Sequence, residues 1–212
     1  MNSIEWQISN LPVAYEEAVS IMEARVADIQ SYRSPELVWL LEHPPLYTAG
    51  TGACSKDLLD EALLPVHKTG RGGKYTYHGP GQRVAYVMLD LRTRGRDVHG
   101  YINQLEEWLI KTLAQFNVIG ERRKGRIGIW IDQGDGREAK IAAAGVRIRH
   151  WITYHGVSLN VEPNLDHYRG IVPCGIGEHG VTSLMDLGIP ATTVEIDHAL
   201  KETFFHVFSP LT

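Results

Sequence analysis

The sequence predicts an α+β (mixed α/β) fold in which helices pack on a mixed sheet. Five runs are rich in β-branched and aromatic residues, as strands are, and three longer segments repeat apolar residues with the period of a helix. These elements interleave without the regular strand–helix–strand rhythm of a doubly wound sheet. The length of 212 residues fits one domain spanning residues 1–212.

Three helices are expected, over residues 11–30, 98–116 and 193–208. In the first, Pro12 suits the opening turn, and apolar residues such as Ala18 and Met22 fall on one face. Before the third, Thr192 and Glu195 have the spacing of a capping box.

The strands are expected over residues 36–43, 83–91, 126–132, 140–150 and 152–161. Little more than Trp151 separates the last two, which predicts a hairpin. Glycine-rich loops at 48–53, 69–82 and 174–180 each follow an apolar run. Glycine lets a ligand approach the main chain, so we expect these loops to converge on a site at one end of the sheet.

Composition narrows the class of protein. The net charge of −4 gives no global attraction to nucleic acid or to an anionic membrane. The two cysteines cannot make a disulfide framework, the N-terminal segment does not have the pattern of a signal peptide, and no run approaches the roughly 20 apolar residues of a membrane span. We therefore expect a protein of the reducing cytoplasm with free thiols.

Several short motifs have weak support. Gly175, Gly177 and Gly180 match the dinucleotide pattern GxGxxG, with Glu195 further on, but Pro173 precedes the turn and no strand–helix–strand unit surrounds it. In "GRGGKY", Tyr75 stands where a phosphate-binding loop needs Ser or Thr. Ten histidines occur without CxxC or HExxH spacing, so no metal site is expected.

Two cysteines and one lysine bear on nucleophilic chemistry. Cys174 lies in the turn "VPCGIGEHG", and a thiol there needs a nearby cation or a helix N-terminus to ionise. Lys140 begins the small-residue run "KIAAAG" and can point into a pocket, although spacing alone favours a lysine that starts a strand in water. Cys54 is interpreted as a small structural residue.

Histidines and arginines leave alternatives open. His78 and His155 both precede glycines, and each is either a buried histidine bonded to backbone or an orienting group in a site. His150 and His179 are expected as polar surface or loop residues. The basic segments 92–96 and 121–126 are either solvated turns or a docking patch for an acidic partner.

Four segments together resemble the bacterial lipoyl(octanoyl) transferases: "HPPLYTAGTGA" (43–53), "RGGKYTYHGPGQRVAYVMLDLR" (71–92), "KIAAAGVRIRHWITYHGVSLNV" (140–161) and "LDHYRGIVPCGI" (165–176). The resemblance implies a biotin/lipoate-ligase-like fold with a smaller second sheet. It implies transfer of an octanoyl group from octanoyl-acyl carrier protein to a lysine of lipoyl domains in 2-oxoacid dehydrogenase complexes and in the glycine cleavage H protein. No cofactor, metal or nucleotide is implied.

The resemblance also implies roles for individual residues. Cys174 would carry the thioester, and Lys140 would lower the pKa of that cysteine. The implied substrate-binding residues are Arg71, Gly72, Gly73, Lys74, Tyr75, Thr76, Tyr77, His78, Ala143, Ala144, Gly145, Gly156, Val157 and Ser158. Gly52 stands where the family often has arginine, and Tyr168 where phenylalanine is common.

Three rival functions differ in chemistry. An ATP-dependent lipoate or octanoate ligase would activate a free acid and need no thiol at Cys174. A non-catalytic module would merely hold lipoyl domains or carrier protein. A cysteine hydrolase would need an acid to complete a Cys-His-Asp set, and none is identifiable.

Overall fold

The computed structural model describes residues 4–134, 136–172 and 179–208. Within these ranges, one large mixed sheet has the order β1-β2-β6-β10-β9-β8-β7, with β11 pairing onto β9. The β1–β2 and β11–β9 pairs are parallel and the others are antiparallel, which confirms the predicted mixed sheet. The strands are β1 (Ile4–Ile8), β2 (Glu36–Leu41), β6 (Gln82–Met88), β7 (Glu121–Arg123), β8 (Arg126–Gly134), β9 (Arg137–Arg149), β10 (Ile152–Asn160) and β11 (Gly180–Val181).

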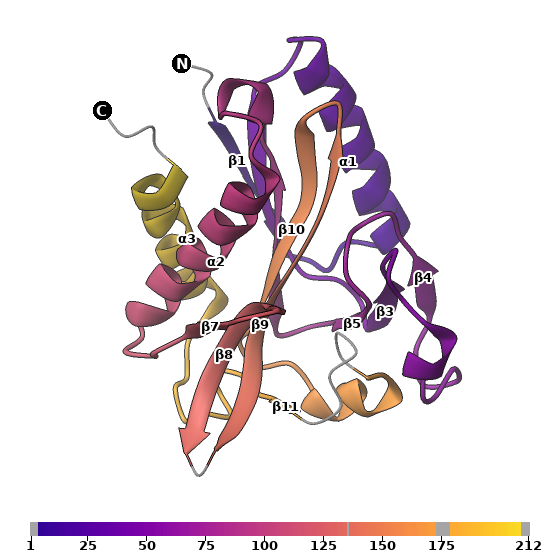
Figure 1. Cartoon of the computed structure of the whole chain (residues 1–212), viewed down its shortest axis with the longest axis vertical. Coiled ribbons are helices and arrows are strands. Elements are labelled where there is room, and N and C mark those ends of the chain that lie inside the picture. Colours follow the sequence, from indigo (N-terminus) through magenta and orange to yellow (C-terminus); the bar gives the residue numbers. More distant parts are fainter. Residues whose placement is uncertain (1–3, 135, 173–178, 209–212) are drawn as a thin grey trace.

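A helix covers one face of this sheet, and two helices cover the other (Figure 1). The first is α1 (Tyr15–Gln30), and the other two are α2 (Val98–Ala114) and α3 (Thr193–Phe208). Alternate residues of β6 point to opposite faces of the large sheet. Val84 and Tyr86 pack with α1, whereas Ala85 and Val87 pack with α2 and α3. None of the described helices is long and apolar enough to cross a membrane.

A smaller sheet has the order β4-β3-β5, formed by β3 (Leu46–Ala49), β4 (Val66–Lys68) and β5 (Tyr75–His78). The expectation that 48–53 and 69–82 are wholly loops is therefore wrong in part. The run "YTYH" has strong β propensity and pairs antiparallel with β3, which outweighs the flanking glycines. Short 3₁₀ helices cover Ser55–Asp57, Leu91–Thr93 and Leu165–Gly170.

The helices lie where the sequence predicts them, except at the start of α1. Pro12 precedes this helix and is not in its first turn, because Val13 N donates to Glu42 O and the chain stays extended through Ala14. At α3, the predicted capping box is confirmed: Thr192 N donates to Glu195 Oε2 at 2.8 Å, and Glu195 N donates to Thr192 Oγ1 at 3.2 Å.

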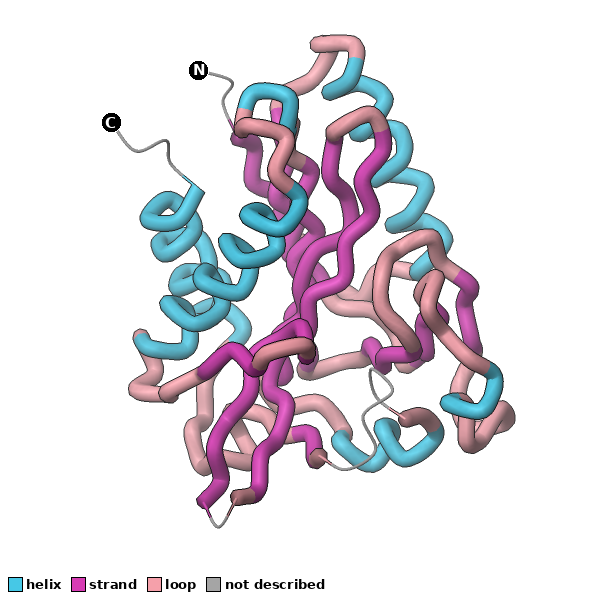
Figure 2. The backbone as a smooth tube through the Cα atoms, in the orientation of Figure 1, coloured by secondary structure: helices cyan, strands magenta, loops and turns pink. Residues whose placement is uncertain are grey.

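The predicted hairpin is confirmed as β9 and β10, which run together through the middle of the molecule (Figure 2). Its turn consists of His150 and Trp151, with φ values of 52° and 66°. Positive φ at both central residues is the geometry that matches the twist of a two-residue hairpin. Although neither residue is glycine, the long ladder behind the turn holds it in this shape.

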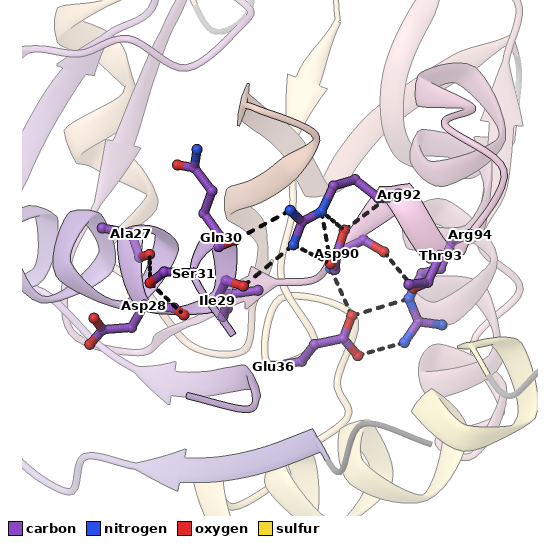
Figure 3. A network of polar contacts seen from close by, with 10 residues as sticks. All are labelled: Ala27, Asp28, Ile29, Gln30, Ser31, Glu36, Asp90, Arg92, Thr93 and Arg94. Carbon is purple, nitrogen blue, oxygen red and sulfur yellow. Dashed lines mark hydrogen bonds and ion pairs between the residues drawn. The ribbon is translucent and has the colours of Figure 1, made fainter. Parts of the chain in front are cut away.

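Two arginines of the basic segment 92–96 form ion pairs with acidic residues of the same chain (Figure 3). Arg92 Nη2 lies 2.7 Å from Asp90 Oδ2, and Arg94 Nη2 lies 2.6 Å from Glu36 Oε2; both acids are buried. Arg92 also donates to the carbonyl oxygens of Ile29 and Gln30 at the end of α1. These contacts fasten Arg92 and Arg94 to α1 and β2, whereas Gly95 and Arg96 form an exposed turn, so the solvated-turn interpretation holds for only part of this segment. In 121–126, Arg122 likewise pairs with Glu106 and Glu107, and both Arg123 and Arg126 pair with Glu138.

Candidate functional site

A cavity of about 530 Å³ lies where the loop 69–74, β5 and the central strands meet. Most of the predicted substrate-binding residues line it: Arg71, Gly72, Gly73, Lys74, Thr76, His78, Ala143, Ala144, Gly145, Gly156, Val157 and Ser158. His155 lines it too. Tyr75 and Tyr77 do not, because alternate residues of β5 face the other way and pack with Tyr47 and Ile171 in the core of the small sheet.

Arg71 holds one wall of the cavity in place. Its buried guanidinium donates to Thr48 O at 2.8 Å and to Lys74 O at 2.9 Å from Nη2, and to Gly72 O at 2.9 Å from Nη1. Thr51 N donates to Arg71 O, so the loops 48–53 and 69–74 pack together as predicted. The third glycine loop lies mostly outside the described residues.

The loop also covers an edge of the large sheet. Strand β8 pairs with β9 only as far as Ala142, and Gly72 N donates to Val146 O at 2.9 Å further along β9. Gly145 and Gly156 face each other across the β9–β10 ladder. A Cβ on Gly145 would lie 3.4 Å from Gly72 O, and one on Gly156 would lie 2.1 Å from Ala85 O. Glycine is therefore required sterically at Gly156, and at Gly145 it keeps the loop close to the strand.

Lys140 lies within β9 and is buried, so the interpretation of a lysine that begins a strand in water is wrong. Its Nζ is 5.2 Å from the ring centroid of Trp130, a cation–π distance. Gly128 makes room for it, because a Cβ there would lie 2.4 Å from Lys140 Cε. A small recess beside the cavity is lined by Thr76, Lys140, Ala142, Ala143, Ser158, Asn160, Tyr168 and Val181. It shares Thr76, Ala143 and Ser158 with the main cavity, which connects the lysine to the cavity wall.

Cys174 lies outside the described residues, as do Pro173, Gly175 and Gly177. The flanking chain is held on both sides. Val172 N donates to Asp57 O at 2.8 Å, and Gly180 and Val181 pair with Ala139 and Lys140. Thr182 N donates to Lys140 O at 3.0 Å, so the chain after this segment is bonded to the lysine's own strand.

His179 lies in a loop, as the sequence predicts, whereas Cys54 differs from its sequence interpretation. The ring of His179 is half-buried and lies 5.5 Å from that of Trp130, the ring that contacts Lys140. Cys54 is exposed at the start of a 3₁₀ helix and is not a packed structural residue.

A cluster of buried aromatic and imidazole rings closes the cavity on the α1 side. Tyr15, His78, Tyr86 and His155 line the cavity, and His43 lies behind them. His43 Nδ1 donates to Val13 O at 2.6 Å, so its Nε2 accepts from the Tyr86 hydroxyl at 2.7 Å. Tyr15 Oη and His155 Nε2 are hydrogen-bonded at 3.3 Å.

Burial keeps these histidines neutral. Desolvation lowers the pKa of His43 to about 4. Desolvation, with a further contribution from the nearby Arg71 cation, lowers the pKa of His155 to about 3. The pKa of His78 is well below its ordinary value, chiefly for the same reason of burial. The cluster is therefore uncharged at neutral pH.

His78 and His155 stand out in the sequence as candidate site residues, whereas Tyr15, His43 and Tyr86 do not. Tyr15 and Tyr86 follow apolar periodicities that indicate only core positions, and His43 ends a strand run in "EHPP". No local pattern distinguishes such rings from ordinary core residues, because α1, β2 and β6 bring them together only in the fold.

A polar chain leads from the ring cluster to the Lys140 recess. His78 Nδ1 lies 2.6 Å from Gln82 Oε1, and Gln82 Nε2 donates to Asn160 Oδ1 at 2.9 Å and to Tyr168 Oη at 3.0 Å. Asn160 and Tyr168 both line the recess. Among the residues that the structure describes, no three His, Cys, Asp or Glu side chains gather so that they could hold a metal ion.

Comparison with known proteins agrees with this geometry. Residues 14–205 match the family described as the lipoyl protein ligase A/B catalytic domain. The chain is 64% identical to an octanoyltransferase of Paramagnetospirillum magneticum (strain ATCC 700264 / AMB-1) over 97% of both chains. It is 65% identical to an octanoyltransferase of Parvibaculum lavamentivorans over 96% of this chain and 92% of the relative.

Solved structures show the same fold at low sequence identity. The bipartite lipoate protein ligase of Thermoplasma acidophilum has a TM-score of 0.69 at 15% identity, covering 97% of this chain and 84% of that one. P. falciparum LipL1, solved in complex with lipoate, has a TM-score of 0.74 at 11% identity, covering 96% of this chain and 60% of that one. The predicted ligase-like architecture with a second, smaller sheet is confirmed.

Proposed function

The chain belongs to the lipoyl protein ligase A/B catalytic domain family and is an acyltransferase of octanoyl groups in protein lipoylation, and we propose that it acts through a thioester on Cys174. The donor in this proposal is octanoyl-acyl carrier protein. The acceptors are lysines of lipoyl domains in 2-oxoacid dehydrogenase complexes and in the glycine cleavage H protein. The observation that carries the proposal is the cavity, whose wall is continuous with the recess of Lys140.

The cavity suits an acyl chain held against backbone and small side chains. Ala143, Gly145 and Gly156 leave its walls open, and Val84 and Val157 supply apolar surface. At about 0.8 kcal/mol for each buried methylene, an eight-carbon tail contributes roughly 5 kcal/mol to binding. An octanoyl thioester also stores enough free energy to form an amide, so the reaction needs no nucleotide.

The proposed chemistry uses Lys140 twice. As an ammonium beside Cys174, it favours the thiolate, which attacks the carbonyl carbon of the donor thioester. The bond from that carbon to the donor sulfur breaks, the donor takes a proton from the Lys140 ammonium and leaves as a thiol, and the octanoyl group remains on Cys174 beside a neutral Lys140. The acceptor lysine's amine then attacks the new thioester, Cys174 leaves, and Lys140 takes the proton lost by that amine.

The chain after Cys174 supports a position near this lysine. Only the six residues 173–178 separate the described flanks, and the second flank is bonded to β9 at Ala139 and Lys140. A catalytic thiol also requires a reducing compartment, which is why we place the protein in the cytoplasm.

Intact-mass analysis tests the covalent step. Mixing the protein with octanoyl-acyl carrier protein is expected to add one octanoyl group, and adding a lipoyl domain is expected to move that group to the domain. Cys174→Ser should abolish both events, whereas Cys54→Ser, which changes the chain's other cysteine, should preserve them. Full transfer by Cys174→Ser would contradict the thioester, as would modification from free octanoate and ATP without carrier protein.

Alkylation of the thiol tests the role of Lys140. In the Cys54→Ser background only Cys174 reacts, so its rate against pH reports thiolate formation. Lys140→Met removes the cation and should move this profile to higher pH. An unchanged profile would remove Lys140 from the activation of the thiol.

A further inference from the structure

The cavity has two arms on opposite faces of the central strands. One arm faces α1 and the small sheet, where Val84, Tyr86, His155 and Tyr15 line it. The other arm faces α2 and the β7–β8 hairpin, where Val98, Ile102, Ile127, Ala144, Val146 and Ile148 line it. Both arms are apolar enough for an alkyl chain, so burial alone does not decide which one holds it.

The recess of Lys140 opens onto the first arm. Thr76, Ala143 and Ser158 line both the recess and the cavity, and Thr76 belongs to the small sheet. In β9, Ala144 and Val146 pack toward α2, so Ala143 and Gly145 face the small sheet. An acyl chain whose carbonyl lies at the recess therefore continues along Ala143 and Gly145 toward α1.

The length of this arm matches an octanoyl chain. The paired residues Ala143 and Ser158 mark its start, and the pair Val146 and His155 lies three residues further along the same ladder. Three residues of strand span about 10 Å at about 3.3 Å each. Seven carbon–carbon steps of about 1.3 Å, from bonds of about 1.5 Å, span about 9 Å.

A closed wall stands at that distance. Tyr15 and His155 are hydrogen-bonded at 3.3 Å, and the His155 ring lies edge-on to Tyr86 with centroids 5.8 Å apart. Each of the three side chains is no more than 5% exposed. His155 has a φ of 59° and stacks on Tyr154, so two successive residues of β10 present their rings to the same cluster. A strained backbone that brings a ring into the cavity wall is a feature of ligand sites.

We propose that Tyr15 and His155 close the acyl arm and determine the length of the acyl chain that the protein transfers. This inference rests on the proposed function. It assigns to the pair a role in specificity and none in bond making or breaking. The wall carries no charge, so the end of an alkyl chain contacts it without facing an ion.

The experiment compares octanoyl-, decanoyl- and dodecanoyl-acyl carrier protein as donors, with kcat/KM for transfer to a lipoyl domain as the readout. Tyr15→Ala opens the wall, and Tyr15→Phe keeps the ring while removing the hydrogen bond. Ile102→Ala enlarges the other arm by a comparable step. His155→Gly is a second way to open the wall, and glycine accepts the positive φ at this position.

Tyr15→Ala or His155→Gly should raise the decanoyl-to-octanoyl ratio of kcat/KM about tenfold relative to the unchanged protein, because two more methylenes become buried. Tyr15→Phe and Ile102→Ala should leave that ratio within about twofold, since neither lengthens the acyl arm. A ratio that moves with Ile102→Ala and not with the wall variants would overturn the inference, and so would folded wall variants with an unchanged ratio. Failure of the unchanged protein to transfer any acyl group would instead overturn the proposed function.

Discussion

At the scale of single residues, His155 has an unusual combination of properties. It is buried, its backbone has a positive φ, and its Nδ1 has no hydrogen-bond partner among the described residues. Burial without a second partner disfavours the charged form, which is why the pKa of His155 falls to about 3.

This shift predicts a loss of stability in acid. The unfolded chain takes up a proton at the ordinary histidine pKa near 6.5, whereas folded His155 takes one up only near 3. Stability is therefore complete above pH 6.5 and falls as the pH is lowered through that window, by about 1.4 kcal/mol per pH unit for each such group. His155→Asn, which tolerates the positive φ, should reduce the loss between pH 6.5 and 5 by about 2 kcal/mol.

Urea unfolding at several pH values measures this effect. His150→Asn is the matched control, because His150 also has a positive φ but is exposed in the hairpin turn. His150→Asn should leave the pH dependence of the free energy of unfolding unchanged. Equal behaviour of the two variants would contradict the assignment of the acid sensitivity to the buried ring.

At the scale of elements, α3 is attached to the sheet by a buried ion pair. Arg83 of β6 and Asp197 of α3 form two hydrogen bonds of 2.7 Å, and Arg83 is almost wholly buried. Desolvation raises the pKa of Asp197 despite this partner, so the attraction does not fully offset the cost of burying the carboxylate. The pair therefore orients the helix more than it adds to stability.

Removing one partner of the Arg83–Asp197 pair should lower the free energy of unfolding more than replacing both partners with apolar residues. Asp197→Asn leaves a buried guanidinium without its carboxylate and is expected to cost about 3 kcal/mol of unfolding free energy. Arg83→Met combined with Asp197→Leu should cost less than Asp197→Asn alone, as measured by urea unfolding at pH 7. Asp28→Asn, in the exposed pair with Arg33, should cost less than about 1 kcal/mol. A double variant at least as unstable as Asp197→Asn would contradict this account.

Long elements were predictable from the sequence and short ones were not. The helices α2 and α3 and the β9–β10 hairpin repeat their pattern over many residues, so chance matches to another period are few. Strands such as β4 and β11 have three residues or fewer, which is too short for any period to appear. Their partners, distant in sequence, determine that they are strands.

Some residues of the candidate site were likewise predictable from the sequence, and others were not. The motif resemblance located the residues that line the cavity from the loop 69–74 and from β9 and β10. It did not identify Tyr15 or His43, which enter from α1 and from the end of β2. Nor could spacing show that Lys140 is buried, because that depends on Gly128 of the neighbouring strand having no side chain.

At the scale of the whole molecule, the two sheets are expected to unfold together. The small sheet has its own cluster of buried residues, among them Tyr47 and Tyr77. Contacts to the large sheet cross the boundary: Gln82 Nε2 donates to Tyr77 O at 3.1 Å, and the Gly72 amide bonds to β9. If residues 1–212 form one domain, as the sequence predicts, unfolding should show one cooperative transition.

Two probes can test this cooperativity separately. All five tryptophans lie outside the small sheet, so their fluorescence reports the large sheet and its helices. Amide hydrogen exchange in β3 and β5 reports the small sheet. Coincident urea midpoints are expected. An earlier midpoint for β3 and β5 would show two separately folding units.

The hydrogen bond from Gly72 N to Val146 O affects how an acyl group can enter the cavity. Outward movement of the loop 69–74 would break this bond and leave the Val146 carbonyl unpaired. We therefore expect this loop to stay in place when substrate binds. An acyl group would then enter the cavity lengthwise, with its methyl end first, between the side chains that line it. We therefore expect straight acyl chains to be transferred more readily than branched or bulky ones.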